Sequence, residues 1–277
     1  MRDVTVEDDA AWGRHGPVVV RRYRCAAEAT AQTLVWVHGG AFAWGNLDMP
    51  ESDAVARALA AAGRPVIAVD YRRVPRWSRW REPGSGSLPG VRYPLPVDDV
   101  VDVLEWVQAE RGSAVLGGAS AGACLAAAAT LRQVRGRRAT PAALVLAYGI
   151  FHSALPAASL ELRGRIRSGE RIERSRITSV NRMNRNYAGS PEAMHDAFAF
   201  PGGHNLAGMP PTLVLDADRD YLRASSERFA QELAEADVDV SRHVIAKARH
   251  GFLNKPASSL FTEGINYMAG WLGGDRP

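Results

Sequence analysis

The sequence predicts an α/β fold, a mostly parallel, doubly wound sheet with helices on both faces. Short apolar, β-branched runs alternate along the chain with segments of helical pattern, which is typical of βαβ units. The length of 277 residues, with 46% hydrophobic and 23% charged residues, fits a single domain over residues 1–277. We find no internal repeat and no long low-complexity linker that would divide it.

Strands are expected where apolar runs are short. The run TLVWV at 33–37 has no charged residue, and PVIAVD at 65–70 has one only at its end, so both should be buried strands. The full set of expected strands is 3–6, 17–23, 33–37, 65–70, 114–116, 143–148, 212–216 and 240–245.

Helices are expected where apolar residues recur at helical spacing. Residues 98–110 have acidic side chains in the first turn and Gly112 beyond the end, as helix termini favour. Residues 52–62 stop at Gly63, a natural helix end. The expected helices are 52–62, 98–110, 121–131, 222–236 and 258–272.

Two segments interrupt this alternation. Residues 76–93 form a lid-like insertion rich in Trp, Arg, Gly, Ser and Pro, and residues 151–208 form a cap segment between two core strands. Segments this long between core elements are commonly lids or binding elements. We therefore expect both to lie over a functional site.

The segment Gly118-Ala119-Ser120-Ala121-Gly122 matches the pattern G-x-S-x-G between an expected strand and an expected helix. Such a turn strains the serine backbone and accepts only small neighbours, and it holds the hydroxyl above a helix N-terminus. Free N–H groups there favour developing negative charge. The pattern alone is common by chance in a chain rich in Ala and Gly, so it needs support from other motifs.

Support comes from His38-Gly39-Gly40-Ala41-Phe42, which follows a buried strand upstream of the serine. Glycines let the backbone approach a substrate carbonyl and direct N–H groups at an oxyanion. We predict Gly39 and Gly40 as the donors, together with the N–H of Ala121. His38 precedes the serine, whereas this type of turn uses the order serine, acid, histidine, so His38 is expected to brace the loop.

An acid and a base are expected after the last strands. The segment after residue 215 offers three aspartates, Asp216, Asp218 and Asp220, and His250 follows the last expected strand. A buried carboxylate that orients the imidazole completes a serine triad. The residues alone leave the choice among the aspartates open.

Taken together, the motifs resemble the hormone-sensitive-lipase-like, or bacterial acetyl esterase, branch of the α/β hydrolases. The resemblance covers about 33–272 and rests on His38–Phe42, Asp70-Tyr71-Arg72 with Pro75, Gly118–Gly122, Asp220-x-Leu222-Arg223 and His250-Gly251-Phe252. It implies an α/β-hydrolase fold and a triad of Ser120, Asp220 and His250.

The chain also departs from the family pattern. Ala41 stands for the third glycine of the oxyanion loop, Ala119 for the aspartate before the serine, Ala123 for the final glycine, and Tyr221 for the proline after the acid. None of these changes removes a catalytic group. Only 37 residues precede His38, too few for the family's N-terminal cap helices, so we expect the lid to be built from 76–93 and 151–208.

The function expected from these motifs is hydrolysis of small, short-acyl carboxylic esters through an acyl-enzyme, without a cofactor or metal. Two alternatives stay open: a small amidase or formamidase, and a catalytically inactive small-molecule-binding protein on the same fold. Aromatic residues near the motifs are expected to bind the substrate: Phe42, Trp44, Trp77 and Trp80. Trp77 and Trp80 could instead merely pack over neighbouring helices.

Charge and composition limit the other partners. The net charge is +4, and eight arginines fall between Arg163 and Arg185, diluted by glutamates; we favour a solvated helix face over nucleic-acid binding. Cys25 and Cys124 are expected to be free, buried thiols. The polar N-terminus and the lack of a long apolar run predict a cytoplasmic protein that does not bind membranes. The expected partner is a small ester, and the sequence leaves open whether the protein is a monomer or a homodimer.

Overall fold

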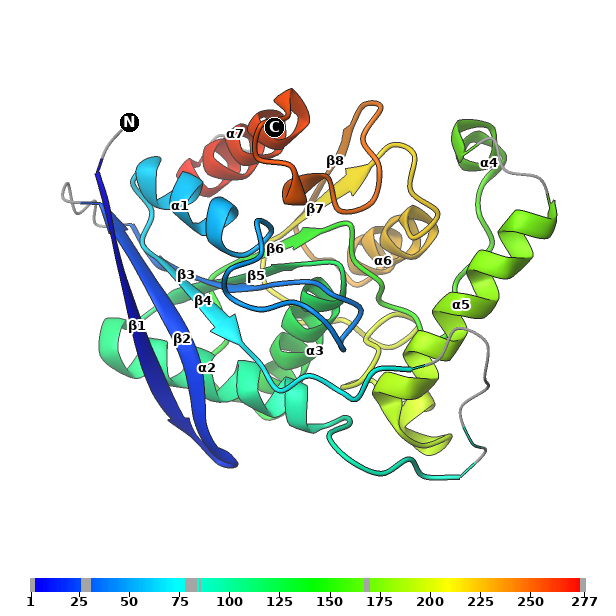
Figure 1. Ribbon diagram of the computed structural model, residues 1–277, viewed down its shortest axis with the longest axis horizontal. Coiled ribbons are helices and arrows are strands. Elements are labelled where there is room, and N and C mark those ends of the chain that lie inside the picture. Colours follow the sequence, from blue (N-terminus) through cyan, green and yellow to red (C-terminus); the bar gives the residue numbers. More distant parts are fainter. Residues whose placement is uncertain (1–2, 26–30, 78–83, 85, 167–169, 275–277) are drawn as a thin grey trace.

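The protein, described by a computed structural model, is built on one eight-stranded sheet (Figure 1). The structure describes residues 3–25, 31–77, 84, 86–166 and 170–274. The strand order is β1-β2-β4-β3-β5-β6-β7-β8, and the six strands from β4 to β8 are parallel. The strands are β1 (Val4–Gly13), β2 (Gly16–Cys25), β3 (Thr33–Val37), β4 (Val66–Asp70), β5 (Ala114–Ala119), β6 (Leu144–Ala147), β7 (Thr212–Ala217) and β8 (Val240–Ile245).

The two N-terminal strands are longer than their apolar pattern predicts. They pair antiparallel along their whole length, from Val4 opposite Cys25 to Gly13 opposite Gly16. Charged residues extend the pairing, because Arg21 binds Asp8 across the two strands. The apolar signal cannot detect such exposed, charge-paired strand residues, which is why the expected strands 3–6 and 17–23 were too short.

Helices cover both faces of the sheet, as predicted. In Figure 1, α1 and α7 lie on one face, and α2 and α3 lie on the other. One buried cluster joins the α1 and α7 side chains to one face of the sheet, and a second cluster joins α2, α3 and α6 to the other face. The helices are α1 (Asp53–Ala61), α2 (Leu95–Arg111), α3 (Ala121–Arg135), α6 (Arg223–Glu235) and α7 (Ser259–Gly273), with a 3-10 turn η2 (Phe252–Asn254) before α7.

The segment 151–208 contains two further helices and a short turn. These are α4 (Leu160–Ile166), α5 (Glu170–Ala188) and the 3-10 turn η1 (Glu192–His195). Figure 1 shows α4 and α5 at one side of the molecule, away from the β1–β2 hairpin. In the expected insertion 76–93, residues 78–83 and 85 lie outside the described residues. The later part of the insertion contacts the segment 151–208, because the Leu88 N–H donates to Gly189 O at 2.7 Å.

Cys25 and Cys124 are buried and free. Within the described part of the chain, no helix has the length and apolar character needed to cross a membrane.

Candidate active site

Ser120 sits in a strained turn between β5 and α3. Its φ of 53° and ψ of −118° are unusual for a residue with a side chain. Such strain costs on the order of 1–3 kcal/mol and persists only where the surroundings enforce it. Here the Ser120 N–H donates to Ala147 O at 2.9 Å, so the neighbouring strand β6 holds the turn in place.

The two glycines of the motif are required by space. A Cβ on Gly118 would lie 2.6 Å from the Gly122 backbone, and a Cβ on Gly122 would lie 2.1 Å from Val37 O. Both clashes are with backbone atoms, which cannot move aside as a flexible side chain can. The pattern G-x-S-x-G is therefore a steric requirement of packing α3 closely against the end of β3.

Three side chains from distant parts of the chain meet at this turn. His250 Nε2 lies 3.0 Å from Ser120 Oγ, and His250 Nδ1 lies 2.7 Å from Asp220 Oδ2. Asp220 follows β7, and His250 follows β8, so both stand at the carboxyl ends of parallel strands, where ligands bind in such sheets. The structure thus brings together all three residues expected to form a triad.

The charged groups around His250 raise the pKa of its imidazole. Burial lowers the pKa of His250, but the charge and hydrogen bond of Asp220, with a smaller contribution from the charge of Glu51, outweigh burial and raise that pKa above its usual value. The Asp220 side chain is fully buried, and the His250 side chain is 35% exposed. The imidazole therefore faces the cleft while its partner carboxylate is shielded from water.

The other two aspartates are engaged elsewhere. Asp216 binds Arg242 at 2.7 Å, and burial raises the pKa of Asp216 to about 6 despite that arginine. Asp218 accepts the Lys247 N–H at 2.9 Å. Of the three candidates that the sequence left open, Asp220 is the one hydrogen-bonded to the histidine.

The oxyanion loop corrects one prediction. The N–H of Gly39 donates to Glu51 Oε1 at 2.8 Å, so our prediction of Gly39 as an oxyanion donor is wrong. Gly40 and Ala41 line the cleft beside Ser120 instead. Ala121 is the first residue of α3, where backbone N–H groups have no partner within the helix.

Gly40 and Ala41 both adopt left-handed backbone conformations, with φ of 106° and 53°. A side chain on Gly40 would meet Trp44 O at 2.1 Å, so only glycine fits there. Ala41 occupies a conformation that costs a residue with a side chain about 1–2 kcal/mol. The loop tolerates alanine in place of the family's third glycine at that cost.

Glu51 is the main site residue that the sequence analysis missed. It is 2% exposed, and its carboxylate accepts three hydrogen bonds: from the Gly39 N–H at 2.8 Å, the Tyr148 hydroxyl at 2.6 Å and the Asn254 amide at 3.0 Å. A buried carboxylate is stable in such a position only when donors surround it. No local motif marks Glu51, because its partners lie far away in the sequence.

His38 braces the loop from beneath. It is fully buried, its ring stacks on Tyr71 with centroids 4.6 Å apart, and its Nδ1 lies 2.7 Å from Gly39 O. The Tyr71 hydroxyl donates to the same oxygen at 3.1 Å. The bracing role expected for His38 agrees with this geometry.

A cleft of about 390 Å³ opens above Ser120 and His250. Trp44 and Trp77 line it and meet edge to face, with ring centroids 4.4 Å apart. Trp80 lies outside the described residues. The remaining walls are mostly apolar and come largely from α5 and the loop after β7: Val180, Met183, Tyr221 and Leu222, with Met49 from the loop before α1.

Phe42 corrects a second prediction, because it does not line this cleft. It is fully buried and stacks on Tyr187 with centroids 3.9 Å apart, within the larger core cluster. The turn after Gly40 carries the Phe42 side chain away from the cleft. Phe42 therefore joins the oxyanion loop to α5, and its side chain belongs to the core and not to the wall of the cleft.

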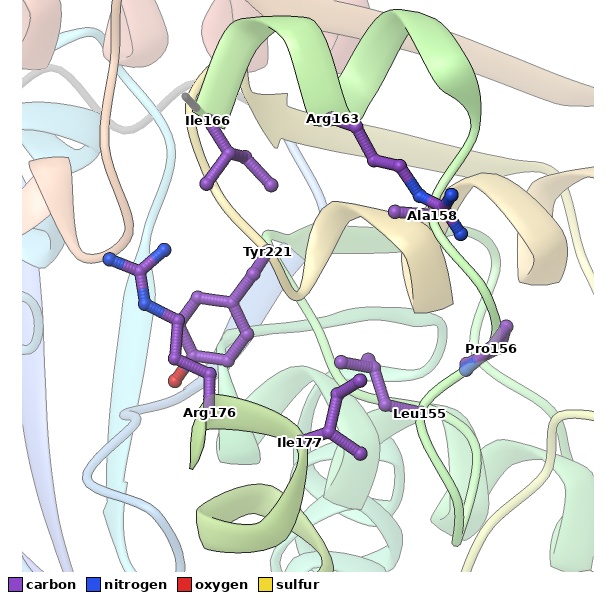
Figure 2. A pocket seen from close by; sticks show the side chains of 8 residues that line it. All are labelled: Leu155, Pro156, Ala158, Arg163, Ile166, Arg176, Ile177 and Tyr221. Atoms are coloured by element: carbon purple, nitrogen blue, oxygen red, sulfur yellow. The ribbon is translucent and has the colours of Figure 1, made fainter. Parts of the chain in front are cut away.

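A second, much smaller cavity of about 30 Å³ adjoins the cleft and shares Tyr221 with it (Figure 2). Leu155 and Ile177 point into it below the Tyr221 ring, and Ile166 of α4 points into it from the other side. The Arg176 guanidinium lies beside the Tyr221 ring, 5.3 Å from its centroid. Tyr221 therefore separates the cleft from the space beneath the cap helices.

The chain is similar in sequence to a family of known proteins. The alpha/beta hydrolase fold family matches residues 34–79 and 87–254 of the chain. Esterase LipI of Mycobacterium tuberculosis is 28% identical over 264 residues, which cover 91% of this chain and 76% of LipI.

Solved structures of esterases have a similar fold. An esterase from Pyrobaculum calidifontis superposes with a TM-score of 0.80 at 26% identity, covering 97% of this chain and 84% of the esterase. Brefeldin A esterase, a bacterial homologue of human hormone-sensitive lipase, superposes with a TM-score of 0.78 at 26% identity, covering 98% of this chain and 77% of that one. The chain belongs to the α/β-hydrolase-fold family, in the branch of esterases related to hormone-sensitive lipase.

Proposed function

We propose that the protein hydrolyses small carboxylic esters with short acyl chains, with Ser120 as nucleophile, His250 as general base and Asp220 as the residue that orients the base. The family and the esterase relatives establish the class, a carboxylesterase-type hydrolase. The chain of hydrogen bonds from Ser120 through His250 to Asp220 is the observation that carries the residue roles.

In the first half-reaction, Ser120 Oγ donates its proton to His250 Nε2 and attacks the ester carbonyl carbon. The buried Asp220 carboxylate holds the Nδ1–H tautomer and stabilises the imidazolium. The tetrahedral intermediate collapses, and the alcohol leaves with the proton from His250. A water molecule then repeats the sequence on the acyl-enzyme and releases the acid.

The oxyanion of each intermediate is proposed to bind the N–H groups of Gly40, Ala41 and Ala121. Gly40 and Ala41 line the cleft beside Ser120, and Ala121 begins α3, whose N-terminal dipole favours negative charge. Each such donor contributes on the order of 10²–10³ in kcat in related chemistry. Glu51 supports this arrangement by holding the Gly39 peptide in place.

The size of the cleft supports the short acyl chain. A volume of about 390 Å³ must hold both the acyl portion and the alcohol portion, and the Trp44–Trp77 pair closes one side. This volume lies at the low end of ligand pockets, which span roughly 300–1,000 Å³. Acetyl to butyryl groups fit this space better than long acyl chains do.

A panel of p-nitrophenyl esters from acetate to palmitate tests the proposal. We expect the highest kcat/KM for acyl chains of two to four carbons, and a loss of kcat on the order of 10³-fold or more in Ser120→Ala. A formanilide substrate in the same panel tests the amidase alternative. Preference for palmitate, preference for the anilide, or full activity in Ser120→Ala would each contradict the proposal.

A further inference from the structure

Four arginines surround a cavity beside the active site that the proposed reaction does not use. The cavity has a volume of about 370 Å³, and its lining consists of Gly164, Arg165, Ile166, Arg176, Arg219 and Arg249. Arg165 comes from α4 and Arg176 from α5, whereas the other two follow β7 and β8. We call this cavity the arginine pocket.

Two of the four arginines, Arg165 and Arg219, lie near carboxylates that partly neutralise their charge. Arg165 Nε lies 2.9 Å from Glu161 and 3.6 Å from Asp218. Arg219 Nε lies 3.9 Å from the second oxygen of Asp218. Asp218 is 4% exposed and is not among the residues that line the pocket.

The other two arginines, Arg176 and Arg249, differ in having no carboxylate partner among the residues that the structure describes. Within the described part of the chain, neither Arg176 nor Arg249 forms an ion pair. The Arg176 guanidinium lies over the Tyr221 ring, 5.3 Å from its centroid, and the face of an aromatic ring accepts no conventional hydrogen bond (Figure 2). A hollow with two guanidinium groups that no described carboxylate neutralises attracts an anion, and the planar fork of arginine suits carboxylate and phosphate oxygens.

Two arginines of the pocket adjoin residues of the catalytic cleft. Arg249 directly precedes His250 in the chain, and Tyr221, on which Arg176 packs, lines the catalytic cleft. Because the acyl portion is short in the proposed function, the portion of the substrate long enough to reach the pocket is the alcohol. An anion at the far end of that alcohol would meet the arginines while the ester lies at Ser120.

We propose that the arginine pocket binds a carboxylate or phosphate group on the alcohol portion of the ester substrate. This inference rests on the proposed esterase function and adds a substrate class to it: acetyl or other short-acyl esters of anionic alcohols. It also assigns a role to part of the arginine-rich stretch between Arg163 and Arg185, which the sequence pattern indicated only as a solvated helix face.

Three acetate esters of matched length test the proposal: 6-acetoxyhexanoate, 6-acetoxyhexyl phosphate and the neutral 6-acetoxyhexanamide, with four- and eight-carbon alcohols as length controls. Acetate release is followed in a pH-stat. We expect kcat/KM for at least one anionic ester to exceed that of the amide by about tenfold, as for hydrogen bonds to charged groups. The preferred anion shows whether the pocket takes carboxylate or phosphate, and 0.5 M NaCl should reduce the preference.

The variants Arg176→Gln and Arg249→Gln should reduce the anion-to-amide ratio of kcat/KM towards one. Arg138→Gln is the matched control. The Arg138 side chain is 63% exposed, lies between α3 and β6, and pairs with Glu105 of α2. This substitution removes the same charge and so corrects for long-range attraction of anions. Equal kcat/KM values for the anionic and neutral esters would refute the proposal that the arginine pocket binds an anion. The same fall of the anion-to-amide ratio in Arg138→Gln would also refute it.

Binding to Ser120→Ala, measured by calorimetry with the intact esters, separates this inference from the proposed function. Tighter binding of an anionic ester than of the amide, lost when Arg176→Gln is added, supports the pocket even if no ester is turned over by the wild type. If the protein hydrolyses p-nitrophenyl acetate but shows no preference for anionic esters in binding or rate, the proposed esterase function is supported and the proposed anion binding is refuted.

Discussion

Replacing Glu51 with alanine leaves three buried donors without their acceptor: the Gly39 N–H, the Tyr148 hydroxyl and the Asn254 amide. Each unpaired buried donor costs about 1–3 kcal/mol, so the three together cost about 3–9 kcal/mol. Glu51 borders the cleft, and water entering there would satisfy part of this loss. We therefore expect Glu51→Ala to lose about 3–5 kcal/mol of unfolding free energy in urea denaturation.

Glu51→Gln separates hydrogen bonding from charge. The glutamine oxygen can still accept the Gly39 N–H, and its amide can donate to the Tyr148 oxygen, but the Asn254 amide loses its acceptor. We therefore expect a stability loss of about 1–3 kcal/mol, less than for Glu51→Ala. The negative charge of Glu51 raises the pKa of His250, and its loss lowers that pKa. Because the neutral imidazole is the active base, the acid limb of kcat/KM should move to lower pH.

A pH profile of kcat/KM with p-nitrophenyl acetate measures that shift. The matched control is Glu232→Gln, which neutralises a buried glutamate of α6 that binds His152 and the Gly203 N–H. The control should leave the acid limb unmoved. The reasoning is refuted if Glu51→Ala is as stable as the wild type, or if Glu51→Gln leaves the acid limb in place or moves it to higher pH.

Three further substitutions test the site. Asp220→Asn should lower kcat by about 10⁴-fold because the imidazole loses its orienting carboxylate, whereas Asp218→Asn should cost far less; equal losses in kcat assays would contradict the assignment. Trp77→Ala should raise KM and change the acyl-length preference, since Trp77 lines the cleft, while Trp12→Ala, a control at an 81% exposed tryptophan, should change neither. Phe42→Ala should lower the unfolding free energy by about 3–5 kcal/mol, as for buried phenylalanines, without altering acyl preference; a changed preference with unchanged stability would restore Phe42 as a ligand contact.

Much of the molecule could be predicted from local sequence because the signals are local. Most of the parallel strands are buried on both faces, so they are nearly continuous apolar runs, and β3 has the predicted bounds. β8 also has the predicted bounds, although it contains Ser241, Arg242 and His243 and is only partly buried. The turn around Ser120 needs small residues within five positions, so its pattern is contiguous. The order of serine, acid and histidine follows from the order of the strands that carry them.

What sequence could not supply depends on contacts between distant segments. The N–H of Gly39 is lost as an oxyanion donor because Glu51 faces it, and Phe42 leaves the cleft because Tyr187 of α5 packs on its ring. Arg176 and Arg249 are 73 positions apart and share a cavity only because α5 packs near the loop after β8. A local pattern determines which backbone conformation a residue adopts, whereas tertiary packing decides which partner each polar group meets.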